Sequence, residues 1–361
     1  GAAKEFEPVA SGTLPNGRAV ILKANGQVEV VSETSTSGPI IPSSSLVSFN
    51  GTDLGDSSTV SFDPNTANKF VIAYRDHGNS YSGTAIVGTV SGTSISFGSE
   101  VVYNSGNTGS SHISFDPNTS GKFVIAYTDS ANSNYGTAIV GTVSGTSLSF
   151  GSEVVFRSAL AYYTNVAFDP NTAGKFVVVY RDNGNSDYGT SIVGTVSGTS
   201  ISYGTAVVFN TSSTYDVSLA FDPNTSGKFV VVYNENSANG KSKVGTRSGT
   251  SISFGSETTF NASNTDSTSA AFDPNTANKF VIAYRDRANS NYGTSIVGTV
   301  SGTSISYGSE VVFKSGNSEP NSISFDPNTA NKFVVAYGPS GVRVVIGTLG
   351  STTASFSSEY I

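Results

Sequence analysis

The sequence predicts an all-β protein of the β-propeller class, because a unit of four strands recurs along it at a spacing of about 53 residues. The pentapeptide FDPNT marks each unit and begins at Phe62, Phe115, Phe168, Phe221, Phe272 and Phe325. No part of the unit shows the 3.6-residue period of a helix. Four antiparallel strands repeated at about 50 residues are typical of a propeller blade, whereas a β-solenoid has much shorter repeats.

The first complete unit contains four strand patterns in order. Strand a is expected at Thr59–Phe62, before a DPNTAN segment in which Pro fixes φ and Asp and Asn favour a turn. Strand b, Lys69–Tyr74, and strand c, Thr84–Val90, are apolar on both faces, which is typical of strands buried on both sides. A Ser-Gly-Thr turn leads to strand d, which begins at Ser94–Phe97 with the alternation of an outer strand.

Six copies of the unit occupy residues 56–361, and we interpret residues 1–55 as a divergent additional blade. The proposed counterparts of the blade elements in this segment are Phe6-Glu7-Pro8, Gly17–Lys23, the hairpin turn Asn25-Gly26, Gln27–Val31 and Ser45–Phe49. The prediction is therefore one propeller domain, 1–361, with seven blades. The alternative is six blades and a separate N-terminal hairpin. In the last copy, Thr353–Ile361 can serve as its own strand d.

Composition narrows the possible partners. The net charge is −7, and no cluster of Lys and Arg is visible, so we expect no nucleic-acid binding. No apolar run approaches the ~18 residues that a membrane span needs. The chain has no Cys, which excludes disulfides and thiolate metal sites.

The two faces of the predicted disc differ in how much they vary between copies. The a–b turn (DPNT) and the c–d turn (SGTS) barely change. The segments between strand d and the next strand a differ strongly, and we expect them to be loops at 104–112, 157–165, 210–217, 261–268 and 314–321. They share a face with the b–c loops. Either these loops drift freely in water, or this face binds a ligand.

The b–c loops carry Arg, Asp and Tyr in several copies, a set that suits carbohydrate because an aromatic ring can cover a sugar face while planar polar groups bind hydroxyls. The candidate ligand-binding residues on the b–c loops are Arg75, Arg181, Arg285, Tyr135, Tyr188 and Tyr292, and those on the d–a segments are Tyr162, Tyr163 and Tyr215. The alternative is that Arg and Asp pair within or between blades and that Tyr caps the blade edge.

Catalytic and metal-binding patterns are weak. The two histidines, His77 and His112, have no counterparts in the other copies, so no Ser-His-Asp set is indicated. The best places for calcium would be Asp76 with Asn79, Asp182 with Asn185, and Asp286 with Asn289, but these loops lack the dense carboxylates of a calcium loop. We expect no enzyme activity, no metal and no cofactor, with a propeller glycosidase as an alternative. The S-x-D-x-G-x-x-W box of sialidase-like propellers is missing.

The repeat consensus FDPNTANKFVIAYRD…YGTAIVGTVSGTSISFGSEVVF resembles a repeat of proteins from marine viruses, notably phages of cyanobacteria and other ocean bacteria. The resemblance covers residues 56–361, and GRAVILKANGQVEVV is similar to the lead-in of such repeats. It implies a non-enzymatic virion appendage, fibre or knob, located in the virion or outside cells. Its partners would be other virion proteins or host surface glycans. It supplies no catalytic residues. The alternative is a secreted bacterial lectin or adhesin.

Overall fold

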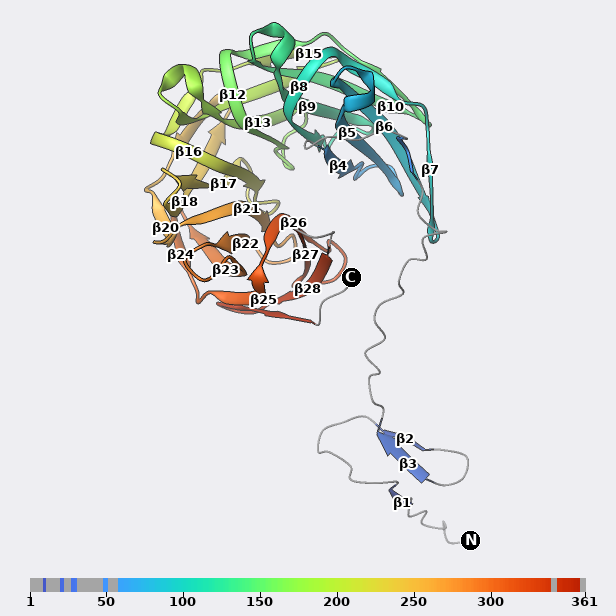
Figure 1. The fold of residues 1–361 in the computed structure, drawn as a ribbon, viewed down its shortest axis with the longest axis vertical. Helices are drawn as coiled ribbons and strands as arrows, with labels where there is room; N and C mark the ends of the chain where they lie inside the picture. The colour runs from blue at the N-terminus through green and yellow to red at the C-terminus, as the bar shows by residue number, and fades with distance from the viewer. Residues whose placement is uncertain are drawn as a thin grey trace.

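The computed structural model describes residues 9–10, 20–22, 27–30, 48–50, 58–338 and 343–357. From Ser58 on, the described chain forms six antiparallel β-sheets arranged as blades around a central axis (Figure 1). We number these blades 1 to 6 along the chain. The propeller architecture predicted from the repeat is confirmed.

Strand a lies innermost in each blade, and strands b and c follow outward. The a strands are β4 (Ser58–Phe62), β8 (Val101–Phe115), β12 (Val154–Phe168), β16 (Val207–Phe221), β21 (Thr265–Phe272) and β26 (Glu319–Phe325). The b strands are β5 (Lys69–Asp76), β9 (Lys122–Asp129), β13 (Lys175–Asp182), β17 (Lys228–Glu235), β22 (Lys279–Asp286) and β27 (Lys332–Gly338). The c strands are β6 (Ser82–Ser91), β10 (Tyr135–Ser144), β14 (Tyr188–Ser197), β18 (Asn239–Ser248), β23 (Tyr292–Ser301) and β28 (Arg343–Leu349).

Strand d has two parts, and its second part runs directly into the next blade. The first parts are β7 (Ser94–Phe97), β11 (Ser147–Phe150), β15 (Ser200–Tyr203), β19 (Ser251–Phe254), β24 (Ser304–Tyr307) and β29 (Ala354–Phe356). In blade 1 the second part is the start of β8, where Val101 pairs with Ala85. The same strand then pairs with β9 as strand a of blade 2, with Phe115 opposite Phe123.

The prediction that the d–a segments are loops is therefore wrong. Residues 104–112, 157–165 and 210–217 lie inside the continuous strands β8, β12 and β16. Between blades 4 and 5 the break is only residues 262–264, which separate β20 (Thr258–Asn261) from β21; between blades 5 and 6, one residue separates β25 (Val311–Asn317) from β26. Small polar residues such as Ser, Thr and Asn predict loops, but here the backbone pairs first with strand c of one blade and then with strand b of the next.

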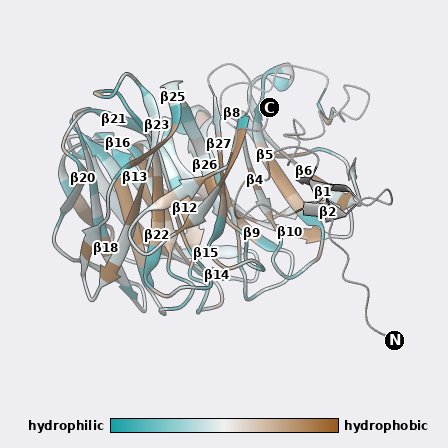
Figure 2. Ribbon diagram, turned by 90° about the horizontal axis from the view of Figure 1, so that it is seen from below, coloured by the Kyte–Doolittle hydropathy of each residue, from teal (hydrophilic) through white to brown (hydrophobic). Residues whose placement is uncertain are grey.

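The core lies between successive blades and combines aromatic side chains of strands b and d with aliphatic side chains of strands b and c. Tyr103 of blade 1 packs against Tyr127 of blade 2, with ring centroids 5.2 Å apart. The phenylalanine at the second position of strand b covers a glycine of strand c, and a Cβ on Gly141 would lie 2.0 Å from the Phe123 ring. Figure 2 shows hydrophobic residues along the strands and hydrophilic ones toward the loops.

The DPNT turns also join neighbouring blades. Asp63 accepts a hydrogen bond at Oδ1 from the backbone N–H of Asn65 (2.9 Å), which forms the turn. Its Oδ2 accepts from the N–H of Gly121 in blade 2 (3.1 Å). Asp116 repeats this link to Gly174 in blade 3 (2.9 Å). On the near-invariant face, Asp63 and Asp116 therefore link neighbouring blades, and turn geometry explains only part of the role of these two aspartates.

A second repeated bond ties strand b to strand d. The phenol of Tyr127 donates to Glu153 over 2.7 Å, and its equivalents are Tyr74 with Glu100 (2.5 Å), Tyr233 with Glu257 (2.7 Å) and Tyr284 with Glu310 (2.5 Å). In blade 3, Ala206 stands where the other copies have Glu. The buried Tyr180 phenol consequently has no hydrogen-bond partner among the described residues.

The N-terminal segment contributes three short described strands, β1 (Val9–Ala10), β2 (Val20–Leu22) and β3 (Gln27–Val30). β2 and β3 pair antiparallel, and β1 pairs parallel with β3. The segments expected to be strands b and c of a divergent blade contain β2 and β3. The assignment of residues 1–55 as a whole blade, including Phe6-Glu7-Pro8 and most of Ser45–Phe49, lies outside the described residues.

Candidate functional site

The innermost strands of blades 2 to 6 each carry a bulge at the face of the b–c loops, and the bulges meet around the axis. Ser110, Tyr163, Asp216 and Ser267 occupy the same repeat position, and each has a positive φ of 47–51°. This left-handed conformation is uncommon for residues other than Gly. All six blades contribute to a cavity of about 620 Å³, which we call the channel mouth, lined by Ser58, Ser110, Ser111, Tyr163, Thr164, Asp216, Val217, Ser267, Thr268 and Pro320.

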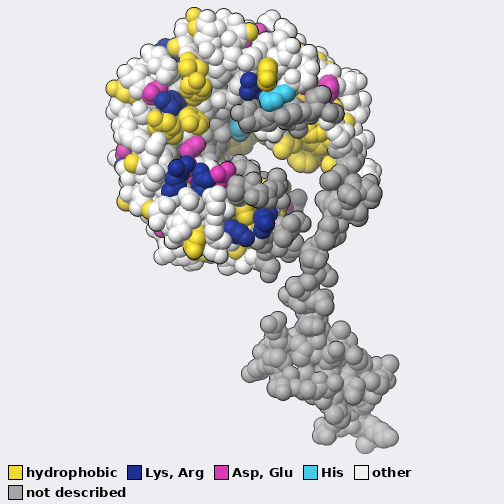
Figure 3. All heavy atoms as spheres, viewed as in Figure 1, with side chains coloured by type: hydrophobic (Ala, Val, Ile, Leu, Met, Phe, Trp, Pro, Cys, Tyr) yellow, Lys and Arg dark blue, Asp and Glu magenta, His cyan; other side chains and the backbone are white. Residues whose placement is uncertain are grey.

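A second cavity of about 430 Å³ adjoins the channel mouth over blades 3 to 5, and we call it the tyrosine pocket. It is lined by Tyr163, Tyr215, Asp216, Asn234, Ser237, Asn264, Thr265, Asp266, Ser267, Arg285 and Arg287. In Figure 3, hydrophobic side chains gather over β16 and charged side chains over β21 beside them. A pocket of this size suits a small ligand, and few polar groups are needed to orient it.

Two tyrosines form one wall of the tyrosine pocket, and an arginine supports one of them from behind. The rings of Tyr163 and Tyr215 meet edge to face, with centroids 6.0 Å apart. The Arg181 guanidinium lies over the Tyr215 ring, 4.5 Å from its centroid. Arg181 is also paired with Asp187 at 2.6 Å, and this hydrogen bond raises its pKa. The arginine therefore stays charged and holds the Tyr215 ring in place.

A charged network forms the opposite wall. Arg285 binds both carboxylate oxygens of Asp266, with Nε–Oδ1 2.5 Å and Nη2–Oδ2 2.6 Å. Arg287 also bonds Asp266, and Arg285 reaches Glu319 at the start of β26. The Asp266 carboxylate raises the pKa of Arg285. A bidentate pair of this kind fixes the guanidinium plane, so the wall presents a preorganised polar surface.

Asp216 lies between the two cavities and lines both. Burial, and after it the nearby Asp266 carboxylate, raise its pKa to about 6. The positive charges of Arg285 and Arg287 lower the pKa of Asp216, but by less than burial and Asp266 raise it.

Two buried polar atoms in the wall of the tyrosine pocket have no protein partner. The Oδ1 of Asn234 and the Oγ1 of Thr265 make no hydrogen bond within the described part of the chain, and both residues are almost completely buried. The amide nitrogen of Asn234 is used, because it donates to the backbone oxygen of Thr265. An unsatisfied buried group costs free energy unless water or a ligand satisfies it. A water molecule or a ligand hydroxyl that reached either atom would satisfy it.

Of the nine candidate residues, the structure brings four together at this pocket: Tyr163, Tyr215, Arg285 and, behind Tyr215, Arg181. Tyr162 is exposed beside them but lines neither cavity. Arg75 lies in blade 1 and stacks on Tyr81, with 4.7 Å between guanidinium carbon and ring centroid. The structure therefore brings candidate residues together only in blades 3 to 5, and their role in binding stays a prediction.

The remaining candidates, Tyr135, Tyr188 and Tyr292, begin strand c and lie outside the lining of both cavities. Their half-buried position matches the alternative reading, in which Tyr caps the blade edge. The aspartates of the b–c loops are likewise structural. Asp76 and Asp129 accept hydrogen bonds from Gly78 and Asn132, which cap the 3-10 turns η2 (His77–Asn79) and η3 (Ser130–Asn132).

The sequence interpretation missed Asp216, Asp266, Arg287, Asn234 and Thr265. A signal for two of them was present. The two positions that precede Thr164 in its copy are Tyr162 and Tyr163, and their counterparts are Tyr215-Asp216 in blade 4 and Asp266-Ser267 in blade 5. Comparing these positions by charge as well as by aromatic character would have pointed to Asp216 and Asp266. The buried Asn234 and Thr265 resemble ordinary strand residues, so no sequence signal marks them.

Within the described ranges, no group of three or more His, Cys, Asp and Glu side chains is placed to hold a metal ion. None of the described helices is long and apolar enough to cross a membrane.

No protein-family model and no curated protein matches the sequence. Solved structures do match. The β-propeller domain of Cps50 (Swd1) from Myceliophteria thermophila has a TM-score of 0.55 at 10% identity, covering 83% of this chain and 85% of that one. Sqt1 from Chaetomium thermophilum has a TM-score of 0.55 at 12% identity, covering 84% and 85%. AofleA from Arthrobotrys oligospora has a TM-score of 0.54 at 8% identity, covering 84% and 86%.

These likenesses show the fold alone, and with the strand order above they define the class: the chain is a repeat-built β-propeller. Within that class, it is a propeller with one polar, aromatic-walled pocket beside its central axis.

Proposed function

We propose that this protein is a non-enzymatic carbohydrate-binding propeller and that the tyrosine pocket is its sugar site. The observation that carries the proposal is the combination, in one cavity of about 430 Å³, of two aromatic rings with the two buried and unpartnered atoms Asn234 Oδ1 and Thr265 Oγ1. Aromatic rings present a flat apolar surface to the C–H face of a sugar ring. A sugar hydroxyl can both donate and accept a hydrogen bond, so it could pair with the buried polar atoms.

The charged wall supports recognition by hydroxyl groups. The guanidinium of Arg285 is fixed in its plane by Asp266, and the neighbouring Ser237 and Asn264 add further polar groups to the lining. A ligand that lacks the matching hydroxyl leaves buried hydrogen-bonding groups of the site unpaired. Such a site therefore discriminates strongly against that ligand.

A glycan array with the full-length protein tests the proposal. We expect binding to a restricted set of glycans and at least a ~10-fold loss of affinity for Tyr215→Ala. The matched control is Tyr81→Ala, because Tyr81 carries the same kind of arginine contact in blade 1, far from the pocket in sequence. Binding to no glycan, or equal losses in both variants, would contradict the assignment.

A second candidate function, hydrolysis of a glycosidic bond, is favoured by one observation. The pKa of Asp216 is raised to about 6 beside Asp266, which two arginines hold. A carboxyl with a raised pKa beside a second carboxylate is typical of glycosidases. The close pairing of Asp266 with Arg285 argues against a nucleophilic role. Incubation of the protein with each bound glycan separates the functions, since a lectin leaves the glycan intact and a glycosidase releases reducing ends that Asp216→Asn abolishes.

We further infer from the repeat that the protein belongs to virus particles and meets host surface glycans through this face. The resemblance to repeats of marine phage proteins supports this. Mass spectrometry of purified virions from infected marine bacteria tests it, and detection only in medium from uninfected cells would favour a secreted bacterial adhesin.

A further inference from the structure

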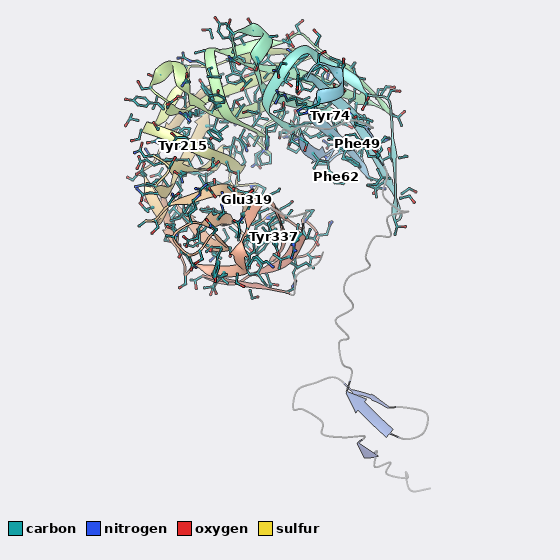
Figure 4. The ribbon with its side chains drawn as sticks, in the orientation of Figure 1. Phe49, Phe62, Tyr74, Tyr215, Glu319 and Tyr337 are labelled. Atoms are coloured by element: carbon teal, nitrogen blue, oxygen red, sulfur yellow. The ribbon has the colours of Figure 1, made fainter. Side chains whose placement is uncertain are left out.

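The channel mouth and the tyrosine pocket share part of their lining. Tyr163, Asp216 and Ser267 line both cavities. Figure 4 shows Tyr215 on β16 and Glu319 on β26, and both strands border the central opening of the ring. The surface that begins at the tyrosine pocket therefore continues to the axis of the propeller.

The channel mouth is the larger of the two cavities. Its volume is about 620 Å³, whereas the tyrosine pocket has about 430 Å³. Cavities of roughly 300–1,000 Å³ hold whole small ligands, so each of the two has room for a sugar unit of its own. The proposed function assigns a ligand only to the smaller one.

Hydroxyl groups make up much of the lining of the channel mouth. Ser110 and Ser267 are half-buried at the same position of two bulges, and Thr164 is buried beside the bulge of β12. The Oγ1 of Thr164 makes no hydrogen bond within the described part of the chain. Hydroxyls donate and accept hydrogen bonds, which suits the hydroxyls of a second sugar unit. Asp216 is the one charged side chain among the described residues of this lining, so a neutral sugar fits better than an acidic one.

We propose that the channel mouth is a second sugar subsite and that the ligand is an oligosaccharide, with one unit in the tyrosine pocket and a neutral unit at the channel mouth. This inference rests on the proposed function, because it extends the same site. The observation that carries it is the shared lining, which joins a pocket with aromatic rings to a larger cavity lined with hydroxyls. A ligand that fills two linked subsites loses its freedom of motion only once, so it is expected to bind at least ~10-fold more tightly than either of its units.

Ser110→Tyr blocks the channel mouth without changing the tyrosine pocket, whose lining does not include Ser110. The equivalent residue of blade 3 is Tyr163, with a φ of 50° against 47° for Ser110, so this backbone position accepts a tyrosine. The matched control is Asn134→Tyr. The equivalent residue of blade 1 is Tyr81, with a φ of 65° against 60° for Asn134, and Asn134 lines neither cavity.

Thr164→Val is a second variant that keeps the size of the side chain. Blade 4 already has Val217 at the equivalent position, so the fold accepts a valine there. Because the Thr164 hydroxyl has no partner among the described residues, we expect the Tm to stay the same or rise. If Ser110→Tyr lowers the Tm, this variant tests the subsite in a folded protein.

Isothermal titration of the full-length protein uses two probes, the strongest oligosaccharide of the glycan array and its component monosaccharides as methyl glycosides. The parent and Asn134→Tyr are expected to bind the oligosaccharide at least ~10-fold more tightly than any methyl glycoside. Ser110→Tyr is expected to remove most of this advantage, and Thr164→Val at least ~3-fold of it, while both keep the affinity of the parent for the best methyl glycoside. Tyr215→Ala is expected to weaken the binding of both probes.

Two kinds of failure can be told apart. If the oligosaccharide binds Ser110→Tyr and Thr164→Val as tightly as the parent, or if the strongest binder contains only acidic sugars, the second subsite is overturned, while the loss in Tyr215→Ala still supports the tyrosine pocket. Binding of no glycan would overturn the proposed function and this inference with it.

Discussion

Tyr163 and Tyr215 lie edge to face with 6.0 Å between ring centroids, although they occupy neighbouring and not equivalent positions in their repeats. Tyr163 is on the bulge of β12, and Tyr215 precedes the bulge of β16. The meeting of successive blades brings the two positions together. A pocket can therefore form at one point of a repetitive ring without any change in the fold.

Thr265→Val should separate binding from stability. Because its hydroxyl has no partner within the described chain, we expect the Tm to stay the same or rise, while affinity for the bound glycan falls about 10-fold. The control is Thr214→Val at the equivalent position of blade 4. The Thr214 hydroxyl accepts from Asn210 at 2.9 Å and donates to Ser212 at 3.1 Å, so this variant should lose stability by ~1–2 kcal/mol. Calorimetric melting and titration of both variants check this, and the reverse pattern would refute it.

The tyrosine–glutamate bonds predict an asymmetry between blades. Tyr127→Phe removes a hydrogen bond to a carboxylate, so we expect a loss of ~1–2 kcal/mol in the free energy of unfolding. Tyr180→Phe removes a hydroxyl that has no partner among the described residues, so we expect no loss or a small gain. Chemical denaturation of both variants measures the difference. Equal losses would show that Tyr180 has a partner in solution.

Asp216→Asn should change the pH dependence of stability. The folded state holds the Asp216 proton up to about pH 6, whereas the unfolded chain releases it near 3.8. The folded state therefore binds more protons between these values, and stability falls as pH rises from about 4 to 6. Asn does not titrate, so the variant should be more stable than the parent by ~1–2 kcal/mol at pH 7 and should lose this advantage at pH 4. Chemical denaturation of the parent and the variant at pH 4 and pH 7 measures the difference in their free energies of unfolding. The same difference at both pH values would contradict the raised pKa.

Two glycine substitutions in blade 2 should differ in cost. A Cβ on Gly141 would lie 2.0 Å from the fully buried ring of Phe123, so Gly141→Ala should destabilise by ~3 kcal/mol or more, or prevent folding. Gly145 has a φ of 63° and open space around it, so Gly145→Ala should cost only ~1 kcal/mol. Comparison of the two melting temperatures tests how closely the Phe123 ring packs on strand c.

The fold could be predicted from the sequence because the same pattern of strands and turns occurs in six copies. Turn residues, two doubly apolar strands and an alternating strand recur in fixed order, so errors in one copy are corrected by the others. The d–a segments were predicted as loops because polar residues such as Ser111 and Thr164 are common in loops. Both residues lie in the bulges of the continuous strands β8 and β12, and no sequence pattern marks these bulges.

The site was predictable in part. Tyr163, Tyr215, Arg181 and Arg285 were found because their types suit a sugar and they lie where copies differ. The sequence could not show that Arg75 and Tyr188 lie outside the pocket. Whether a residue lines the pocket depends on which residue of the neighbouring blade lies opposite it. The unpartnered atoms of Asn234 and Thr265 arise from packing and have no sequence signature.

Isothermal titration of the strongest array glycan into the parent protein and the Tyr163→Ala and Tyr215→Ala variants tests the central claim most directly. We expect one site per chain and a loss of affinity of at least ~10-fold in each variant, with Tyr81→Ala unchanged. Several equivalent sites per chain, or full affinity in both pocket variants, would show that recognition lies elsewhere on the ring.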